Sequence, residues 1–255
     1  MTLASNELSK RRGEALKVSV KPDSSIVTEA DLASEKVIID RIRHYYPDDH
    51  IYSEEAGRSS HLRTPGSYIW IIDPLDGTTN YANGYPYYCI SIGRGQFGAD
   101  GKIQMRHGSV FDAVRQRHYH AALGEGAYVD GKRIYVAPPR ELKQSFLVTG
   151  FYYMQGKDLR REIERFARIA EQCQSVRRDG AAALDLALVA EGVFDAFWEM
   201  GLQPWDVAAG SLLVSEAGGH NRNYGAQTTQ SYYDLEAAGI VSGAPGVVAS
   251  IASQL

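Results

Sequence analysis

The spacing of apolar residues divides the chain into helical and extended segments. Between Thr28 and Pro47 apolar residues recur at helical intervals, which predicts a helix that Pro47 ends. Thr28 is expected to be the N-cap of this helix, with Asp31 three positions later completing a capping box. A short strand is predicted near 50–53, ahead of a loop with two glutamates. The run Ser-Tyr-Ile-Trp-Ile-Ile-Asp at 67–73 predicts a buried strand.

Alternating apolar and polar positions follow over 87–97 and 103–123. They predict antiparallel strands joined by a hairpin turn at Phe-Gly-Ala-Asp-Gly-Lys, and a second hairpin is expected around Asp130 and Gly131. A further strand is expected at 193–201. Helical spacing returns in three segments, which are 158–173, 177–192 and 205–219. Helices and antiparallel strands therefore come in blocks without strict βαβ alternation, which favours a layered α+β fold.

Composition narrows the class of protein. With 255 residues, of which 44% are hydrophobic and 23% charged, the chain is typical of a globular protein. The net charge of -4 provides no polybasic surface, so we expect no nucleic-acid partner. Only two cysteines are present, and the first residues lack the apolar core of a signal peptide, so we expect a cytoplasmic protein. The most apolar stretch, 181–198, carries three carboxylates, which predicts a core helix and strand rather than a membrane span.

Two aspartates end the predicted strand at 67–73. Asp73 and Asp76 flank Pro74-Leu75, so two carboxylates and the Leu75 carbonyl can converge on one point, and hard oxygen ligands of this kind suit Mg²⁺. If a helix begins at 77–79, its free N–H groups can hold a phosphate oxygen. On these residues alone, a capped helix start with two ordinary turn aspartates is the favoured interpretation.

Other carboxylates have the same ambiguity when each is considered by itself. Glu54 and Glu55 follow a predicted strand, and they suit either a metal site or a solvated loop. Asp206 is either a metal ligand or the N-cap of the helix that follows it, and Asp31 belongs to the capping box. The small residues at 208–210 permit close packing of that helix against another backbone.

Four motifs, taken in their order along the chain, resolve this ambiguity. Val-Thr-Glu-Ala-Asp, Ser-Glu-Glu-Ala-Gly, Trp-Ile-Ile-Asp-Pro-Leu-Asp-Gly-Thr-Thr-Asn-Tyr and Trp-Asp-Val-Ala-Ala-Gly-Ser-Leu-Leu-Val-Ser-Glu-Ala-Gly-Gly extend from Val27 to Gly219. Together they resemble the inositol monophosphatase family of Mg²⁺-dependent, lithium-sensitive phosphatases, in the fructose-1,6-bisphosphatase-like superfamily. The resemblance implies a layered αβαβα sandwich in one domain, 1–255. It also implies a metal-site half of about 1–140, a substrate half of about 141–255, and a homodimer.

The resemblance also implies roles for individual residues. Two or three Mg²⁺ ions would be held by the ligands Glu54, Asp73, the Leu75 carbonyl, Asp76 and Asp206. The attacking water would be oriented by Glu54 and Thr78, with Asp31 hydrogen-bonded to the threonine hydroxyl. The backbone N–H groups of Gly77 and Thr78 would hold the phosphate.

On the alcohol side the resemblance implies a second set of contacts. The residues expected beside the alcohol are Asp76, Gly180, Ala181, Ala182 and Glu199. Family members often have threonine or serine where this chain has Ala181. Tyr152 and Tyr153 stand where bacterial relatives usually have a different pattern, so the mouth of the pocket is expected to differ.

The sequence therefore predicts a Mg²⁺-dependent phosphomonoesterase that hydrolyses inositol monophosphate or a similar small polyol phosphate with a metal-activated water. The alternatives are the same chemistry on fructose 1,6-bisphosphate, histidinol phosphate or a 3'-phosphoadenosine nucleotide, and a non-catalytic, metal-binding regulator acting through protein or RNA contacts. Neither a membrane nor a nucleic acid is expected as a partner. His118 and His120 are expected to be exposed sheet residues rather than a metal site, and Arg177-Arg178 a surface or subunit contact.

Overall fold

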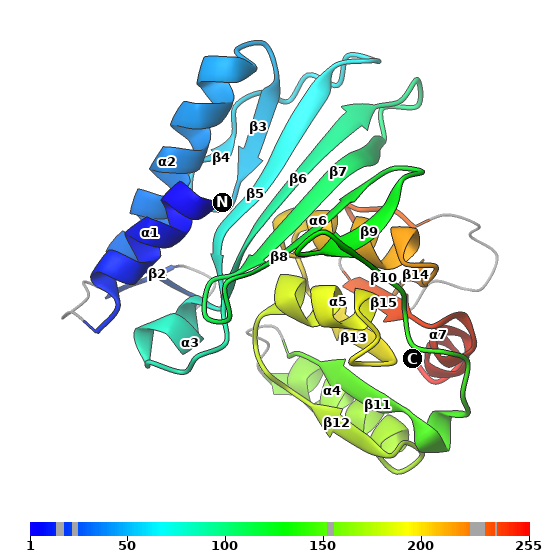
Figure 1. Ribbon diagram of the computed structural model, residues 1–255. Coiled ribbons are helices and arrows are strands. Elements are labelled where there is room, and N and C mark those ends of the chain that lie inside the picture. Colours follow the sequence, from blue (N-terminus) through cyan, green and yellow to red (C-terminus); the bar gives the residue numbers. More distant parts are fainter. Residues whose placement is uncertain (14–17, 22–24, 152–155, 225–232, 238) are drawn as a thin grey trace.

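The computed structural model describes residues 1–13, 18–21, 25–151, 156–224, 233–237 and 239–255 (Figure 1). The described residues form two main sheets and a two-stranded ribbon. The ribbon pairs β1 (Val18–Val20) with β2 (Ile26–Thr28). The first sheet has the order β10-β9-β8-β7-β6-β5-β3-β4, and the second has the order β12-β11-β13-β15-β14.

The strands of the first sheet are β3 (His50–Ser53), β4 (Gly57–Arg58), β5 (Tyr68–Asp76), β6 (Cys89–Phe97), β7 (Ile103–Asp112), β8 (Arg117–Ala122), β9 (Gly126–Val129) and β10 (Lys132–Ile134). The strands of the second sheet are β11 (Phe146–Thr149), β12 (Ser175–Arg177), β13 (Ala196–Met200), β14 (His220–Asn223) and β15 (Gly239–Gly243). The helices are α1 (Thr2–Arg11), α2 (Glu29–Tyr45), α3 (Thr78–Ala82), the 3₁₀ turn η1 (Leu142–Gln144), α4 (Gly156–Ala170), α5 (Ala182–Ala190), α6 (Pro204–Glu216) and α7 (Pro245–Ala252).

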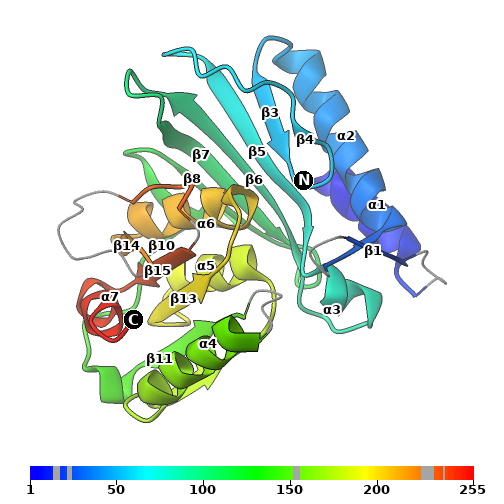
Figure 2. The same cartoon turned by 180° about the vertical axis from the view of Figure 1, so that it is seen from behind.

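These elements stack as five layers, as Figures 1 and 2 show from opposite sides. Helices α1 and α2 cover the outer face of the first sheet, α5 and α6 lie between the two sheets, and α4 and α7 cover the far face of the second sheet. The expected layered αβαβα arrangement of an α+β fold is therefore confirmed.

Close backbone contacts hold α6 against the first sheet. A Cβ on Gly108 of β7 would lie 2.7 Å from the Ala209 carbonyl oxygen. A Cβ on Gly210 would lie 2.5 Å from the Cβ of Leu186 in α5. Side chains at these two glycines would push the layers apart. The expected close packing at 208–210 is confirmed, and it places the first turn of α6 beside the end of β5.

Most elements expected from the pattern are present, but the strands β1, β2, β4, β11, β12, β14 and β15 and the helices α1 and α7 were not predicted. Thr28 caps α2 in a full capping box with Asp31, as predicted. The strand expected to end at Asp73 continues to Asp76. Helix α1 was not predicted, because only a narrow stripe of it, including Ala4 and Leu8, is buried in an otherwise polar segment. The helix expected from 177 begins only at Ala182, since the preceding residues form β12 and a loop.

The apolar stretch 181–198 forms α5 and β13 in the core, as expected. Within the described part of the chain, no helix is both long enough and apolar enough to span a bilayer.

Candidate active site

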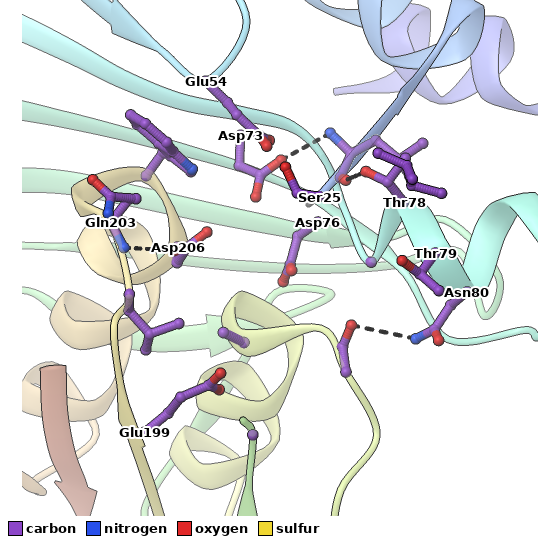
Figure 3. Close-up of a pocket in the computed structure, with 18 of the residues that line it drawn as sticks. Ser25, Glu54, Asp73, Asp76, Thr78, Thr79, Asn80, Glu199, Gln203 and Asp206 are labelled. Atoms are coloured by element: carbon purple, nitrogen blue, oxygen red, sulfur yellow. Dashed lines mark hydrogen bonds between the residues drawn. The ribbon is translucent and has the colours of Figure 1, made fainter. Parts of the chain in front are cut away.

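Residues from both halves of the chain line one cavity of about 410 Å³. It lies between the end of β5 and α3 on one side and α5, β13 and the start of α6 on the other (Figure 3). The predicted residues that line it are Glu54, Asp73, Leu75, Asp76, Gly77, Thr78, Gly180, Ala182, Glu199 and Asp206. Of the remaining predicted residues, Asp31 lies behind Thr78, and Ala181 is buried and packs near Gly77.

A β-bulge directs both aspartates of β5 into this cavity. Residues three apart on a regular strand face opposite sides of the sheet. Asp73 pairs with Ser91 of β6 and Asp76 pairs with Cys89, so β5 has one more residue than its partner between these pairs. The extra residue turns the carboxylates of Asp73 and Asp76 to the same side (Figure 3).

Each of the three aspartates is held by a backbone N–H group. Asp73 Oδ1 accepts a hydrogen bond from the Leu75 N–H at 3.0 Å, and Asp76 Oδ2 accepts one from the Ala183 N–H at 2.7 Å. Asp206 Oδ2 accepts from the Gln203 N–H at 2.7 Å. Gln203 is therefore the N-cap of α6, and Asp206 is the third helical residue of a capping box. The prediction that Asp206 is the N-cap of α6 is wrong, because the helix begins at Pro204 and its N-cap is three residues before Asp206.

Thr78 and Asp31 form the pair that the resemblance implied. The Thr78 hydroxyl lies 2.8 Å from Asp31 Oδ1 and 3.0 Å from the Leu75 carbonyl oxygen, and it can donate its proton to either. Asp31 is fully buried, and its Oδ2 accepts from the Thr28 N–H at 2.8 Å. The capping box of α2 thus fixes the carboxylate that contacts Thr78, so capping and site chemistry use the same residue.

Gly77 shapes the turn between the strand and α3. It is the N-cap of α3 with φ of +91°, and a Cβ there would lie 3.0 Å from the Tyr87 carbonyl oxygen and 3.2 Å from the Ala181 Cβ. A side chain at this position would meet both a strained backbone and a close neighbour. The turn that is expected to hold phosphate is therefore packed directly against the segment before α5.

Glu199 of β13 is on the opposite wall of the cavity and is 8% exposed (Figure 3). It occupies the space over Gly150, where a Cβ would lie within 2.5 Å of both carboxylate oxygens. Burial raises the pKa of Glu199 to about 8, although the charge of Arg178 acts in the opposite direction. A buried carboxyl with so little compensation is suited to hydrogen-bond a polar ligand group.

The sequence model of the inositol monophosphatase family matches residues 2–254 of this chain. The chain belongs to the inositol monophosphatase family.

Relatives within this family carry two kinds of name. Nus factor SuhB of Pseudomonas aeruginosa is 39% identical over 234 residues, which cover 91% of this chain and 83% of that protein. Inositol-1-monophosphatase of Synechocystis is 42% identical over 196 residues, which cover 76% of this chain and 65% of that protein. Among solved structures, inositol monophosphatase from Anabaena is 33% identical with a TM-score of 0.82, covering 99% of this chain and 90% of its own. Membership of this family supports phosphatase activity, whereas the relatives called SuhB are named as Nus factors.

Burial dominates the electrostatics of the family site, and mutual repulsion of the carboxylates adds to it. Burial raises the pKa of Asp73, and the charges of Glu54, Asp76 and Asp206 raise it further. Burial also raises the pKa of Asp206 and, to about 6, that of Asp76. Ionisation of these carboxylates is therefore unfavourable in the cavity by itself, and bound cations would stabilise their charged forms.

Lys21 supplies one positive charge that the sequence did not reveal. Its Nζ lies 2.8 Å from Glu54 Oε1 and 2.5 Å from Glu55 Oε1. Burial lowers the pKa of Lys21, but the two glutamates outweigh burial and the pKa is raised overall. Burial raises the pKa of Glu55 to about 7, with Lys21 opposing it. Glu54 and Glu55 thus both form ion pairs with the ammonium group of Lys21. No sequence motif around Lys21 predicted this contact.

The oxygen atoms of Glu54, Asp73, Asp76 and Asp206 are the kind of ligand that suits Mg²⁺, but their side chains do not converge on one metal position in this structure. Among the residues that the structure describes, no group of three or more His, Cys, Asp or Glu side chains is arranged to hold a metal ion. The reason lies in the contacts above: backbone N–H groups hold the aspartates, and Lys21 holds Glu54. Each of these backbone contacts uses one oxygen of its aspartate, and carboxylate oxygens are the ligands that Mg²⁺ prefers.

Other expectations met mixed outcomes. His118 and His120 are partly buried on the sheet rather than exposed, and His118 Nε2 lies 2.6 Å from Ser109 Oγ. Arg178 is exposed, as expected for a surface residue, and it also lines the cavity and donates to the Phe151 carbonyl oxygen. Tyr152 and Tyr153 lie outside the described residues.

Proposed function

We propose that the chain is a Mg²⁺-dependent phosphomonoesterase acting on inositol monophosphate or a similar small polyol phosphate. The observation that carries the proposal is the cavity in which Asp73, Asp76 and Asp206 repel one another beside the hydrogen-bonded pair of Thr78 and Asp31. Family membership supports the same conclusion. The bound ions, two or three per site, would be held by Glu54, Asp73, the Leu75 carbonyl, Asp76 and Asp206.

The chain's own residues divide the chemistry. Bound Mg²⁺ supplies charge neutralisation on the phosphate and lowers the pKa of a water molecule. Thr78 and Glu54 would orient that water, and as the Thr78 oxygen accepts a proton from the water, its own hydroxyl proton would pass to Asp31 Oδ1. The N–H groups of Gly77 and Thr78 point the phosphate toward the carboxylates, and Asp76, Gly180, Ala182 and Glu199 face the alcohol.

The experiment that tests this function is a substrate panel. We expect purified protein to release phosphate from inositol monophosphate in the presence of Mg²⁺, and Li⁺ to inhibit the release. Fructose 1,6-bisphosphate, histidinol phosphate and 3'-phosphoadenosine nucleotides complete the panel, since each changes the alcohol and leaves the metal chemistry unaltered. Release from one of these alone would reassign the substrate, and no Mg²⁺-dependent release from any ester would remove the phosphatase.

Glu199 provides a prediction about the alcohol. We expect Glu199→Gln to raise KM for a polyol phosphate by up to about tenfold, since an ordinary hydrogen bond contributes about 0.5–1.5 kcal/mol. KM for p-nitrophenyl phosphate, which has no ring hydroxyls to lose, should stay within about twofold. Steady-state kinetics on both esters measure the difference. An equal change in the two KM values would exclude Glu199 as an alcohol contact.

A second candidate is the role named in the SuhB relatives, in which the protein acts as a Nus factor. The 39% identity over 91% of the chain favours it as an additional role, and for this reason the absence of a nucleic-acid partner stays a prediction. We also propose that the protein is a homodimer and lies in the cytoplasm, and sedimentation equilibrium tests the homodimer.

The complete set of acidic residues favours catalysis, because a purely regulatory protein has no need of buried, mutually repelling carboxylates.

A further inference from the structure

Asn80 connects two parts of the cavity that are distant in the sequence. It lies in α3, directly after the turn of Gly77 and Thr78, and its side chain lines the cavity. Its Nδ2 donates to the Tyr87 carbonyl oxygen at 2.8 Å and to the Asp179 carbonyl oxygen at 2.8 Å, with the Gly180 carbonyl at 3.4 Å. Figure 3 shows Asn80 reaching from α3 to the segment that precedes α5. Both N–H bonds of the amide are thus used on backbone acceptors.

The segment that Asn80 holds is the one expected beside the alcohol. Asp179 and Gly180 lead into α5, and Gly180 and Ala182 line the cavity. Gly180 has φ of +82°, a backbone conformation that glycine adopts without the strain that another residue would have. The carbonyl contacts of Asn80 restrain this turn from the side of α3.

Tyr87 closes a ring of contacts around the same region. Its carbonyl accepts from Asn80, and its hydroxyl donates to Asp185 Oδ1 of α5 at 2.5 Å. Helix α5 is linked back to β5 through the Ala183 N–H and Asp76. Hydrogen bonds that form a closed network hold their members more firmly than separate bonds do. Asn80 is the member of the ring that also contacts the segment before α5.

We propose that Asn80 is a positioning residue that sets the alcohol-facing turn at 179–182 against the phosphate-binding turn at 77–78. This inference rests on the proposed phosphatase function for its kinetic consequence. Asn80 touches no reacting atom in this account. It aligns two backbone segments, and misalignment of about 1 Å at such a site can reduce the rate about 10²-fold.

The test uses Asn80→Asp, Asn80→Ala and a matched control. Aspartate keeps the shape of asparagine but replaces the donor with oxygens that repel the carbonyls, and alanine removes the group without adding charge. The control is Asn83→Asp at the end of the same helix, since Asn83 is exposed and its Nδ2 donates only locally, to the Thr79 carbonyl oxygen at 2.8 Å.

Two readouts are measured on each variant. We expect both Asn80 variants to lower kcat/KM for inositol monophosphate by on the order of tenfold to 10²-fold, while kcat/KM for p-nitrophenyl phosphate changes less than about threefold. In the metal-free protein, hydrogen exchange of the amides at 180–184 should accelerate at least about tenfold in both Asn80 variants. Neither quantity should change with Asn83→Asp.

The outcomes separate this inference from the proposed function. Unchanged exchange at 180–184, or equal kinetic losses for the two esters, would overturn the positioning role. If exchange accelerates but the wild-type protein hydrolyses neither ester, the phosphatase proposal fails, and the hydrogen-bonded coupling of the two turns stands on the exchange result alone.

Discussion

Asp73→Asn is expected to remove Mg²⁺-dependent phosphate release almost completely. Asp73 lies at the centre of the carboxylate set, and the loss of one ligand that contributes about 4 kcal/mol to the transition state corresponds to about 10³-fold in rate. The asparagine oxygen can still accept from the Leu75 N–H, so the local backbone should be retained. Initial rates at saturating Mg²⁺ measure the loss.

The same substitution is expected to stabilise the metal-free protein. Ionisation of Asp73 costs free energy in the folded chain, because burial opposes the charge and Glu54, Asp76 and Asp206 repel it, and a neutral amide avoids that cost. We expect the melting temperature at neutral pH to rise by at least about 2 °C, which corresponds to about 1 kcal/mol for a chain of this size. A variant that loses activity and gains stability at once would identify Asp73 as a functional rather than a structural carboxylate.

Asp112 provides the matched control for Asp73. It is a fully buried aspartate that pairs with Cys89 across the next strand, but it lies outside the cavity and is neutralised by Arg115 at 2.8 Å. Asp112→Asn should lower the melting temperature and leave the rate of the folded protein within about twofold. If Asp73→Asn behaves like Asp112→Asn, with lower stability and normal activity, Asp73 is a structural residue.

The second large effect is the dependence of stability on pH and Mg²⁺. The pKa values of Asp73, Asp76 and Asp206 are raised in the folded state, so between about pH 4 and the raised values the folded chain binds more protons than the unfolded one. The free energy of unfolding contributed by these groups therefore falls as the pH rises through this window. For Asp76, with a pKa of about 6, the loss is on the order of 3 kcal/mol between about pH 4 and 8.

Mg²⁺ is expected to reverse this loss. At an ion concentration about 100 times its dissociation constant, binding to the folded state contributes about 2.7 kcal/mol. The rise in melting temperature should be larger at about pH 8 than at about pH 5, because the ligands must be ionised to bind the cation. Thermal unfolding with and without Mg²⁺ at the two pH values measures it. Equal melting temperatures with and without Mg²⁺ at the higher pH would contradict a metal site at these carboxylates.

Local rules in the sequence predicted much of the fold. Thr28 and Asp31 are a capping box in sequence and in structure, since both members lie within one helical turn. The strand end was harder to predict, because the bulge between Asp73 and Asp76 depends on the register with β6 and leaves no local signal. Helix α1 was missed for a related reason, since its stability comes from packing Ala4 and Leu8 rather than from a strong amphipathic pattern.

The site shows the same division between local and distant information. The carboxylates were found because motifs mark them, and the structure places Glu54, Asp73, Asp76 and Asp206 around one cavity. Lys21, Asn80 and Arg178 were not assigned to it, because each reaches the cavity through contacts with residues far away in the chain. Partners separated by such distances are set by the tertiary fold, which residue spacing does not encode.

A Mg²⁺ titration of phosphate release tests whether these carboxylates hold Mg²⁺ for phosphate ester hydrolysis. With inositol monophosphate as substrate, release should be absent in excess EDTA, rise with Mg²⁺ and saturate in the wild-type protein. It should stay at background in Asp73→Asn at every Mg²⁺ concentration. Phosphate release that persists in EDTA, or that Asp73→Asn retains at the wild-type level, would show that these carboxylates do not hold a catalytic Mg²⁺.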